Sequence, residues 1–190
     1  LVIAEVALAS IALICAGLFV QSFENAKEID PGFDPENVML AGINLSTHGY
    51  KRGQGLTFYE RLQTRLTAVP GVDGVTFTEV VPLGFDKGPW ENIEVDGYVP
   101  DPNENMKIYR TPVTEGYFDV MRMPVVDGRD FTVQDDQKSR PVIIVNEAFV
   151  NRFLSGRNSV GRYVSWWDGR RRMEIVGVVG DIKYQQLSEA

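Results

Sequence analysis

The first twenty residues constrain this chain more than any other part of it. They read LVIAEVALASIALICAGLFV, and Glu5 carries the only charge among them. At about 1.5 Å of rise per residue, a helix of this length matches the roughly 30 Å hydrocarbon core of a bilayer. A helix buried in a soluble core would show a polar face, and this run has only Glu5 and Ser10. The run therefore predicts a transmembrane helix.

The flanks of this run argue against a cleaved signal. No basic residue precedes it, and no A-x-A site follows it. A lipoprotein signal needs a small residue before its cysteine, whereas Ile14 precedes Cys15. Because the chain begins with Leu1 instead of methionine, we expect an upstream flank.

The charges that follow the run indicate its orientation. Residues 21–36 contain one base, Lys27, and five acids: Glu24, Glu28, Asp30, Asp34 and Glu36. Cytoplasmic loops beside a span usually carry an excess of lysine and arginine. We therefore expect residues after about 21 to lie outside the cytoplasm. Glu5 lies near one end of the run, which favours a headgroup layer or a neighbouring helix as its partner over a functional site in the bilayer.

Composition excludes several classes of protein. The roughly 170 residues after the run suffice for one domain or two small subdomains. A formal net charge of −7 argues against nucleic-acid binding. Cys15 is the only cysteine and lies in the predicted span, which excludes a small fold held by disulfides.

Periodicity after the span predicts a strand–helix–strand unit. The turn cluster DPGFDP at residues 30–35 ends the first helix. Residues 37–46 alternate as a strand, residues 56–69 carry apolar side chains at helical spacing, and residues 72–81 form a second strand. Elements of these lengths in this order suggest a βαβ-type unit.

A β-rich insertion is expected next. Residues 83–106 are rich in glycine, proline and acids, and a short strand is predicted at residues 92–95. Residues 107–114 then predict a strand, and residues 117–121 predict a short helical turn that Pro124 ends.

The last third of the chain predicts a second βα-type unit. Residues 142–145 form a short apolar strand, and Asn146 is the expected N-cap of the next helix. The pair Asp168-Gly169 is typical of a tight hairpin. Residues 175–179 are apolar on both faces, so they should form a central strand. The patterns together predict an α+β domain.

No catalytic or metal-binding pattern is present in the sequence. His48 is the only histidine, and Cys15 in the span cannot act with it as a nucleophile. A zinc site needs three or four ligands, so one histidine and one cysteine argue against it. Residues 101–105 open like a calcium loop, but Met106 and Pro112 stand where its glycine and glutamate belong. No GxxxxGK[ST] phosphate loop occurs. We predict no catalytic residue, no metal site and no cofactor in this chain.

Aromatic and basic side chains suggest two candidate places for partner contact, the hairpin at residues 166–171 and Trp90 in the insertion. The candidates are Trp90, Trp166, Trp167, Arg170 and Arg171. Tryptophan and arginine are suited to lipid headgroups and to protein partners. The alternative is a solvated hairpin tip whose tryptophans pack inward, and this simpler interpretation is favoured.

Three stretches of the chain together resemble one family. The first is the apolar run continuing into QSF and DPGFDPENV, and the second is VTEGYFDVMRMPVVDGRDFT at residues 113–132. The third is VIIVNEAFVNRFLSG at residues 142–156, followed by VGR and EIVGVVGDIKY. Their order and spacing are similar to those of MacB-like ABC transporter permeases of the FtsX/MacB superfamily, close to the large duplicated orphan permeases found in Acidobacteria. The resemblance covers nearly the whole chain.

The resemblance implies a division of the chain into two parts. Residues 1–29 would be a transmembrane and stalk helix, and residues 30–190 a MacB-type periplasmic core domain. That domain would be α+β, with a porter-like part of βαβ-type units and a β-rich inserted subdomain at residues 83–106. The protein would lie in the bacterial inner membrane, and further helices would follow in a full permease half.

The resemblance also implies partners and a function. The partners would be an ABC ATPase domain or subunit, a second permease half or homodimer, a periplasmic adaptor and membrane lipid. The segment would not be an enzyme, and it would couple cytoplasmic ATP hydrolysis to export or mechanotransmission through a stiff helix reaching about residue 29. Nothing in the sequence identifies the cargo.

Two alternatives to this function stay open. A membrane-anchored enzyme would need acids that converge on one concavity, for which the candidates are Glu79, Asp86, Glu91, Glu94 and Asp96. A static assembly module would need no ATPase partner.

Overall fold

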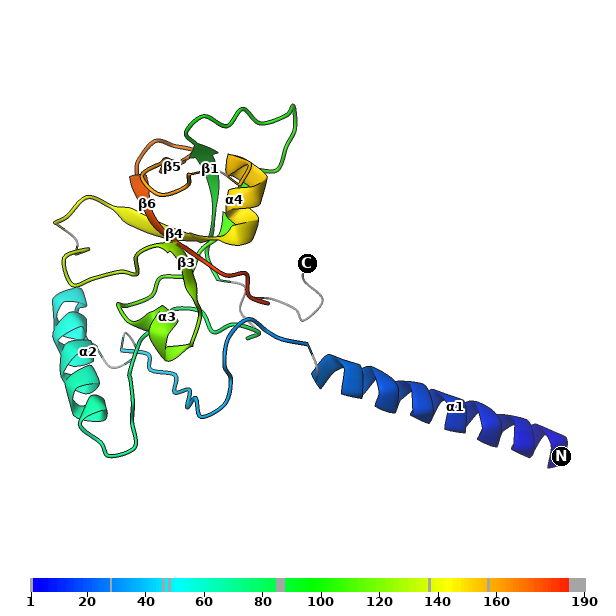
Figure 1. Cartoon of the computed structure of the whole chain (residues 1–190). Helices are drawn as coiled ribbons and strands as arrows, with labels where there is room; N and C mark the ends of the chain where they lie inside the picture. Colours follow the sequence, from blue (N-terminus) through cyan, green and yellow to red (C-terminus); the bar gives the residue numbers. More distant parts are fainter. Residues whose placement is uncertain are drawn as a thin grey trace.

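The computed structural model shows one long helix that projects from an α+β domain (Figure 1). The structure describes residues 2–27, 29–45, 47, 49–84, 88–136, 138–156 and 158–184. The predicted fold class is confirmed. In chain order the elements are α1 (Val2–Lys27), α2 (Arg52–Thr67), β1 (Trp90–Val95), β2 (Lys107–Tyr109), α3 (Tyr117–Val120), β3 (Val125–Gly128), β4 (Val142–Asn146), α4 (Glu147–Leu154), β5 (Tyr163–Trp166) and β6 (Arg172–Val179).

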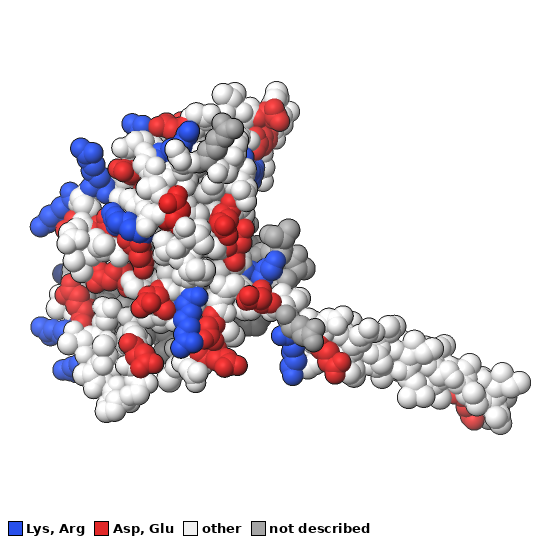
Figure 2. Space-filling model, in the orientation of Figure 1, with Lys and Arg blue, Asp and Glu red and all other residues white. Residues whose placement is uncertain are grey.

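Helix α1 is long and apolar enough to cross a membrane. The candidate span is Val2–Asn25, and none of its most apolar stretch is buried against the domain. Figure 2 shows charged atoms only near the two ends of this helix. The Ser10 hydroxyl donates to the Val6 carbonyl oxygen at 2.9 Å, so this polar group is satisfied within the helix. Helix α1 ends at Lys27, close to the predicted residue 29, and Glu28 lies outside the described residues.

Strand β6 is the centre of a six-stranded sheet. The order is β2-β1-β5-β6-β3, and β4 also pairs with β6. Strands β5 and β3 run antiparallel to β6, whereas β4 runs parallel to it. Residues 175–179 are all buried, which confirms the predicted central strand. The predicted Asp168-Gly169 turn joins β5 to β6, and the Gly169 amide donates to the Trp166 carbonyl oxygen at 2.8 Å.

Helix α4 covers one face of this sheet and completes the main core (Figure 1). Strand β4, helix α4 and strand β6 form a βαβ-type arrangement in which the hairpin strand β5 precedes β6. The predicted N-cap is confirmed, because the Asn146 side chain accepts from the Phe149 amide at 3.1 Å. The main core is formed by residues of β1, β4, β5, β6 and α4 together with Met106: Ile93, Val95, Met106, Val145, Phe149, Phe153, Leu154, Val164, Ile175 and Val178.

The prediction of the first βαβ unit is wrong, because its helix forms but its two strands do not. Helix α2 forms, but residues 38–44 and 72–77 have no regular structure. Directly after the second segment, a single β-bridge joins Thr78 to Val113. The apolar alternation was real, but a strand also requires a neighbouring backbone with which to pair, and periodicity does not report on that neighbour.

The strand predicted at residues 107–114 is shorter than expected. Strand β2 ends at Tyr109, which pairs with Trp90, the first residue of β1. The Thr114 amide instead donates to the Phe77 carbonyl oxygen at 3.0 Å, and Pro112 has no amide with which to continue a ladder. Strand β1 begins at Trp90, two residues before the predicted start.

Gly177 should be one of the least replaceable residues of the sheet. It faces Gly128 across the β3–β6 pair, and a Cβ at this position would overlap the Arg129 carbonyl oxygen. We expect Gly177→Ala to lower the free energy of unfolding by about 1–3 kcal/mol, because the backbones must separate. Denaturant unfolding followed by tryptophan fluorescence measures this loss.

Gly180→Ala is the matched control. Its added Cβ would meet the Pro124 Cγ at 3.5 Å, an ordinary contact distance. Equal midpoints for the two variants would contradict the close approach of β3 and β6.

Candidate functional site

Residues 30–35, the docking turn, connect α1 to the domain. Their sequence DPGFDP limits backbone freedom, because each proline fixes its own φ. The Asp30 carboxylate accepts from the Gly32 amide at 2.8 Å, and the Asp34 carboxylate accepts from the Glu36 amide at 2.8 Å. These hydrogen bonds join residues two positions apart, so they stabilise the shape of the turn locally.

The docking turn is bonded to the domain on two sides. On the side of α3, the Asp34 amide donates to the Met121 carbonyl oxygen at 3.2 Å, and Arg122 Nη1 lies 2.7 Å from Asp34 Oδ2. On the other side, the Lys183 amide donates to the Pro31 carbonyl oxygen at 2.8 Å. The turn is therefore held between the end of α3 and the segment that follows β6.

Gly32 allows the closest approach in this arrangement. Its φ is +81°, and a Cβ at this position would lie 2.5 Å from the Asp181 carbonyl oxygen. Both the backbone conformation and the lack of space require glycine here.

A small apolar cluster supports the docking turn. Tyr117, Met121 and Met123 are buried together near α3. Phe33 of the docking turn and Ile182 of the segment after β6 pack against this cluster. The turn is thus attached by side-chain packing as well as by hydrogen bonds.

Asp181 extends these contacts to the main core. Its Oδ1 accepts from the Ala148 amide at 2.8 Å and from the Asn146 side chain at 2.7 Å. A carboxylate at the first turn of a helix satisfies free amides and complements the helix dipole. Residues 181–183 therefore contact α4 through a side chain and the docking turn through the backbone.

Sequence reasoning identified residues 30–35 as the end of the first helix but did not find their attachment. The available signal was the dense DPGFDP turn together with Gly180-Asp181 directly after the central strand. The pairing of these two segments is a long-range contact, and no local pattern reports it.

The predicted contact residues gather at one end of the sheet. Strands β1 and β5 pair antiparallel, and the Trp167 amide donates to the Asn92 carbonyl oxygen at 2.9 Å. Trp90 is 51% exposed and Trp167 is 65% exposed. Trp166 packs against the main core instead.

Basic side chains lie beside these tryptophans or in the adjacent hairpin turn. Lys107 Nζ lies 4.2 Å from the centre of the Trp90 ring. Arg170 forms an ion pair with Asp168 beside the hairpin turn. The Arg171 carbonyl oxygen accepts from the Trp166 amide at 3.0 Å. The partner role of Trp90, Trp166, Trp167, Arg170 and Arg171 stays a prediction.

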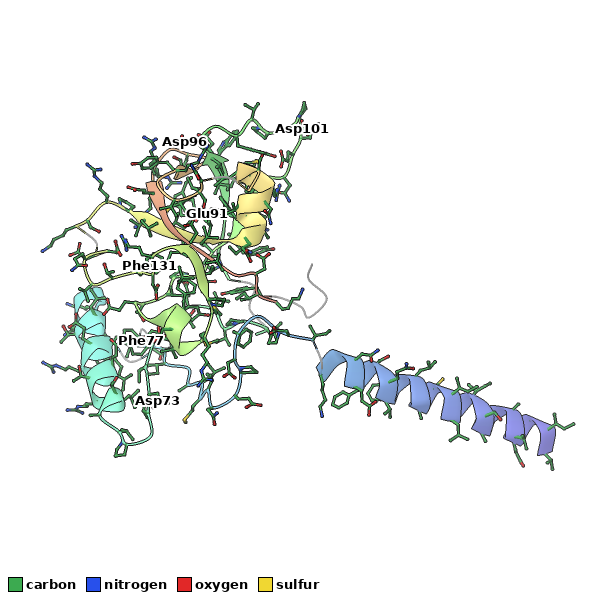
Figure 3. All side chains as sticks on the ribbon, in the orientation of Figure 1. Asp73, Phe77, Glu91, Asp96, Asp101 and Phe131 are labelled. Atoms are coloured by element: carbon green, nitrogen blue, oxygen red, sulfur yellow. The ribbon has the colours of Figure 1, made fainter. Side chains whose placement is uncertain are left out.

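The described acids among those proposed for an enzymatic cleft do not all share one face of the sheet. Glu91 and Glu94 differ by an odd number of positions along β1, so they lie on opposite faces of the sheet. Glu91 pairs with Arg110 at 3.3 Å, and Asp96 pairs with Arg172 at 2.8 Å. In Figure 3, Asp96 lies toward the top of the domain and Glu91 lies nearer its middle.

Two of the residues considered from sequence, Asp86 and His48, lie outside the described residues. In the part of the chain that the structure describes, no group of three or more His, Cys, Asp or Glu side chains is arranged to hold a metal ion.

A helix long and apolar enough to cross a membrane is thus joined by a bonded turn to an α+β domain. The family model described as MacB-like periplasmic core domain matches residues 1–189, and the chain belongs to this family. Domains of this family are extracytoplasmic parts of ABC transporter permeases.

Solved structures of permease domains are similar to this chain. The periplasmic region of MacB from Actinobacillus actinomycetemcomitans is 20% identical, with a TM-score of 0.46 over 65% of this chain and 50% of that one. The extracellular domain of the noncanonic ABC-type transporter YknZ from Gram-positive bacteria is 21% identical, with a TM-score of 0.46 over 66% of this chain and 59% of that one.

A domain of a permease protein from Porphyromonas gingivalis is 13% identical, with a TM-score of 0.41 over 60% of this chain and 46% of that one. The chain matches about half the length of these structures. No curated protein matches the chain.

Substitution of Gly32 should detach the docking turn without unfolding the sheet. We expect Gly32→Ala to speed hydrogen–deuterium exchange at the Asp34 and Lys183 amides roughly tenfold or more, because their acceptors move away. Gly71→Ala is the control, since Gly71 also has a positive φ of +87° but has open space around it. Unchanged exchange at both amides in Gly32→Ala would show that the close approach is unimportant.

The two hairpin tryptophans should behave differently. Because Trp166 packs against the core and Trp167 is exposed, we expect Trp166→Ala to cost about 2–4 kcal/mol of stability and Trp167→Ala to cost less than about 0.5 kcal/mol. Chemical denaturation of both variants measures the difference. A large loss for Trp167→Ala would assign that side chain a structural role and remove it from the contact surface.

Proposed function

We propose that this chain is the first transmembrane segment and the extracytoplasmic domain of an ABC transporter permease that couples cytoplasmic ATP hydrolysis to export or to mechanical work outside the membrane. The attachment of α1 through the docking turn carries this proposal. A helix that moves with the membrane part of a transporter can displace the domain only if the connection is stiff. Two backbone hydrogen bonds, an ion pair and the packing of Phe33 attach the docking turn to the domain, which supports a stiff connection.

The partners follow from the same proposal. An ABC ATPase domain or subunit would supply the energy, and a second permease half or a second copy would complete the membrane part. A periplasmic adaptor and membrane lipid are further partners. The chain itself would contribute no catalytic residue and no cofactor. The protein would lie in a bacterial inner membrane, with residues after about 21 on the extracytoplasmic side, in keeping with the acidic flank of the span.

The proposal predicts that a flexible insertion after Lys27 uncouples the domain. The permease would be reconstituted with its ATPase in lipid nanodiscs, with Cys15→Ser and a dye attached through Val99→Cys, a position that is 88% exposed. Energy transfer from this dye to labelled lipid reports displacement of the domain from the membrane. We expect ATP with vanadate to change the transfer, and Gly-Gly-Ser inserted after Lys27 to abolish the change while ATP hydrolysis continues.

The matched control is the same insertion between Pro102 and Asn103. These residues form an exposed turn away from the docking turn, so the ATP-driven change should persist. If the insertion after Lys27 also leaves the change intact, α1 does not transmit motion. If no variant shows an ATP-driven change, the domain is a static assembly module.

A further inference from the structure

Residues 38–43, the open segment, have unused backbone hydrogen-bonding groups. In the part of the chain that the structure describes, their amides and carbonyl oxygens have no hydrogen-bond partner. The segment starts from the bonded docking turn and leads to Leu45, which lies against Gly55 of α2. In Figure 1 it runs along the rim of the domain below α3. An exposed row of free amides and carbonyls is a template for pairing with another strand.

The side chains of the open segment divide into two faces. Val38 packs against the small apolar cluster at α3, and Leu40 lines the hollow beside that cluster. Met39 and Ile43 are 91% and 43% exposed, and Ala41 between them is exposed as well. Such alternation is what a strand with one packed face shows. The segment therefore has the side-chain pattern of a strand without the neighbour that a strand requires.

The open segment lacks the charges and prolines that normally protect a strand edge. Such residues keep exposed edges from pairing with other chains. Between Glu36 and Lys51 the sequence contains no Asp, Glu, Lys, Arg or Pro. The φ angles of residues 38–43 all lie outside the left-handed region, although Gly42 could enter it. The segment thus presents an uncharged edge whose backbone is compatible with a strand.

The sequence of the open segment is complementary to itself in one antiparallel register. When Ala41 of one copy lies opposite Ala41 of a second copy, Met39 lies opposite Ile43 and Leu40 lies opposite Gly42. The apolar Met39 and Ile43 side chains then meet across the strands on one face. On the other face, the large Leu40 meets the smallest residue of the segment. A two-fold axis through Ala41 produces this register, so both copies use the same surface.

We propose that residues 38–43 pair with the same residues of a second copy of this chain, as two antiparallel strands related by a two-fold axis. Helix α1 favours a second copy as the occupant. It ends at Lys27, a short distance along the chain before Val38, so two copies inserted in one membrane in the same orientation carry their open segments at the same level. Confinement to one membrane raises the effective concentration, which a two-stranded pair needs because it is only marginally stable alone. The pairing rests on the membrane insertion of the proposed function but not on its coupling to ATP.

Disulfide trapping tests the register. The full chain with Cys15→Ser and Ala41→Cys would be held in nanodiscs loaded with two copies and mildly oxidised. Paired Cα atoms of antiparallel strands lie about 4.5–5.5 Å apart, which suits a disulfide. We expect at least about fivefold more cross-linked dimer than with the control Val99→Cys, whose position is 88% exposed. Equal yields would assign the dimer to random collision and overturn the proposal.

A charge pair tests the same register from neighbouring positions. In the Ala41→Cys chain, Met39→Lys should lower the dimer yield about threefold, because it disrupts two apolar cross-strand contacts. Adding Ile43→Glu should restore the yield, because this carboxylate faces the introduced lysine of the second copy. Adding Val99→Glu instead is the control, since it supplies the same charge elsewhere and should restore nothing. Equal yields for the two double variants would overturn this pairing.

Amide exchange tests the pairing without an introduced cysteine. We expect the amides of residues 38–43 to exchange roughly tenfold or more slowly in nanodiscs with two copies than in nanodiscs with one. Fast exchange in both samples would show that the edge stays open. Slow exchange in both would show that a strand from another source covers it, and either result overturns the proposal. These measurements need no ATPase, so their failure is distinguishable from failure of the proposed coupling.

Discussion

The short segment after β6 is the constraint on which the rest of the structure depends. Its Asp181 carboxylate holds the first turn of α4, while the Lys183 amide holds the docking turn at Pro31. The same few residues therefore connect the sheet core to the point where α1 enters. Without this segment, the docking turn would keep only its contacts near α3.

The two parts of the domain differ in how they are stabilised. The sheet and α4 share a continuous apolar core around Ile93, Val164 and Ile175, which are fully buried. The region near α1 has a smaller core around Tyr117, and residues 38–44 and 72–77 are not paired into a sheet. Motion applied at α1 would therefore reach the sheet core through the docking turn and this smaller core.

The exposed tryptophans and the docking turn lie in different parts of the domain. The exposed Trp90 and Trp167 lie at one end of the sheet, where β1 begins and β5 ends. The docking turn lies where α1 joins the domain.

The sequence by itself determined those features that depend on neighbouring residues. Four features were predictable because each depends on a local pattern of polarity or on turn-forming residues. They are the apolar run of α1, the Asn146 cap, the Asp168-Gly169 hairpin and the buried strand at residues 175–179. The tertiary structure alone decided that residues 38–44 form no strand, that Trp166 turns inward while Trp167 does not, and that Gly32 packs on Asp181. These outcomes depend on which distant segment lies alongside, and a local pattern contains no information about that neighbour.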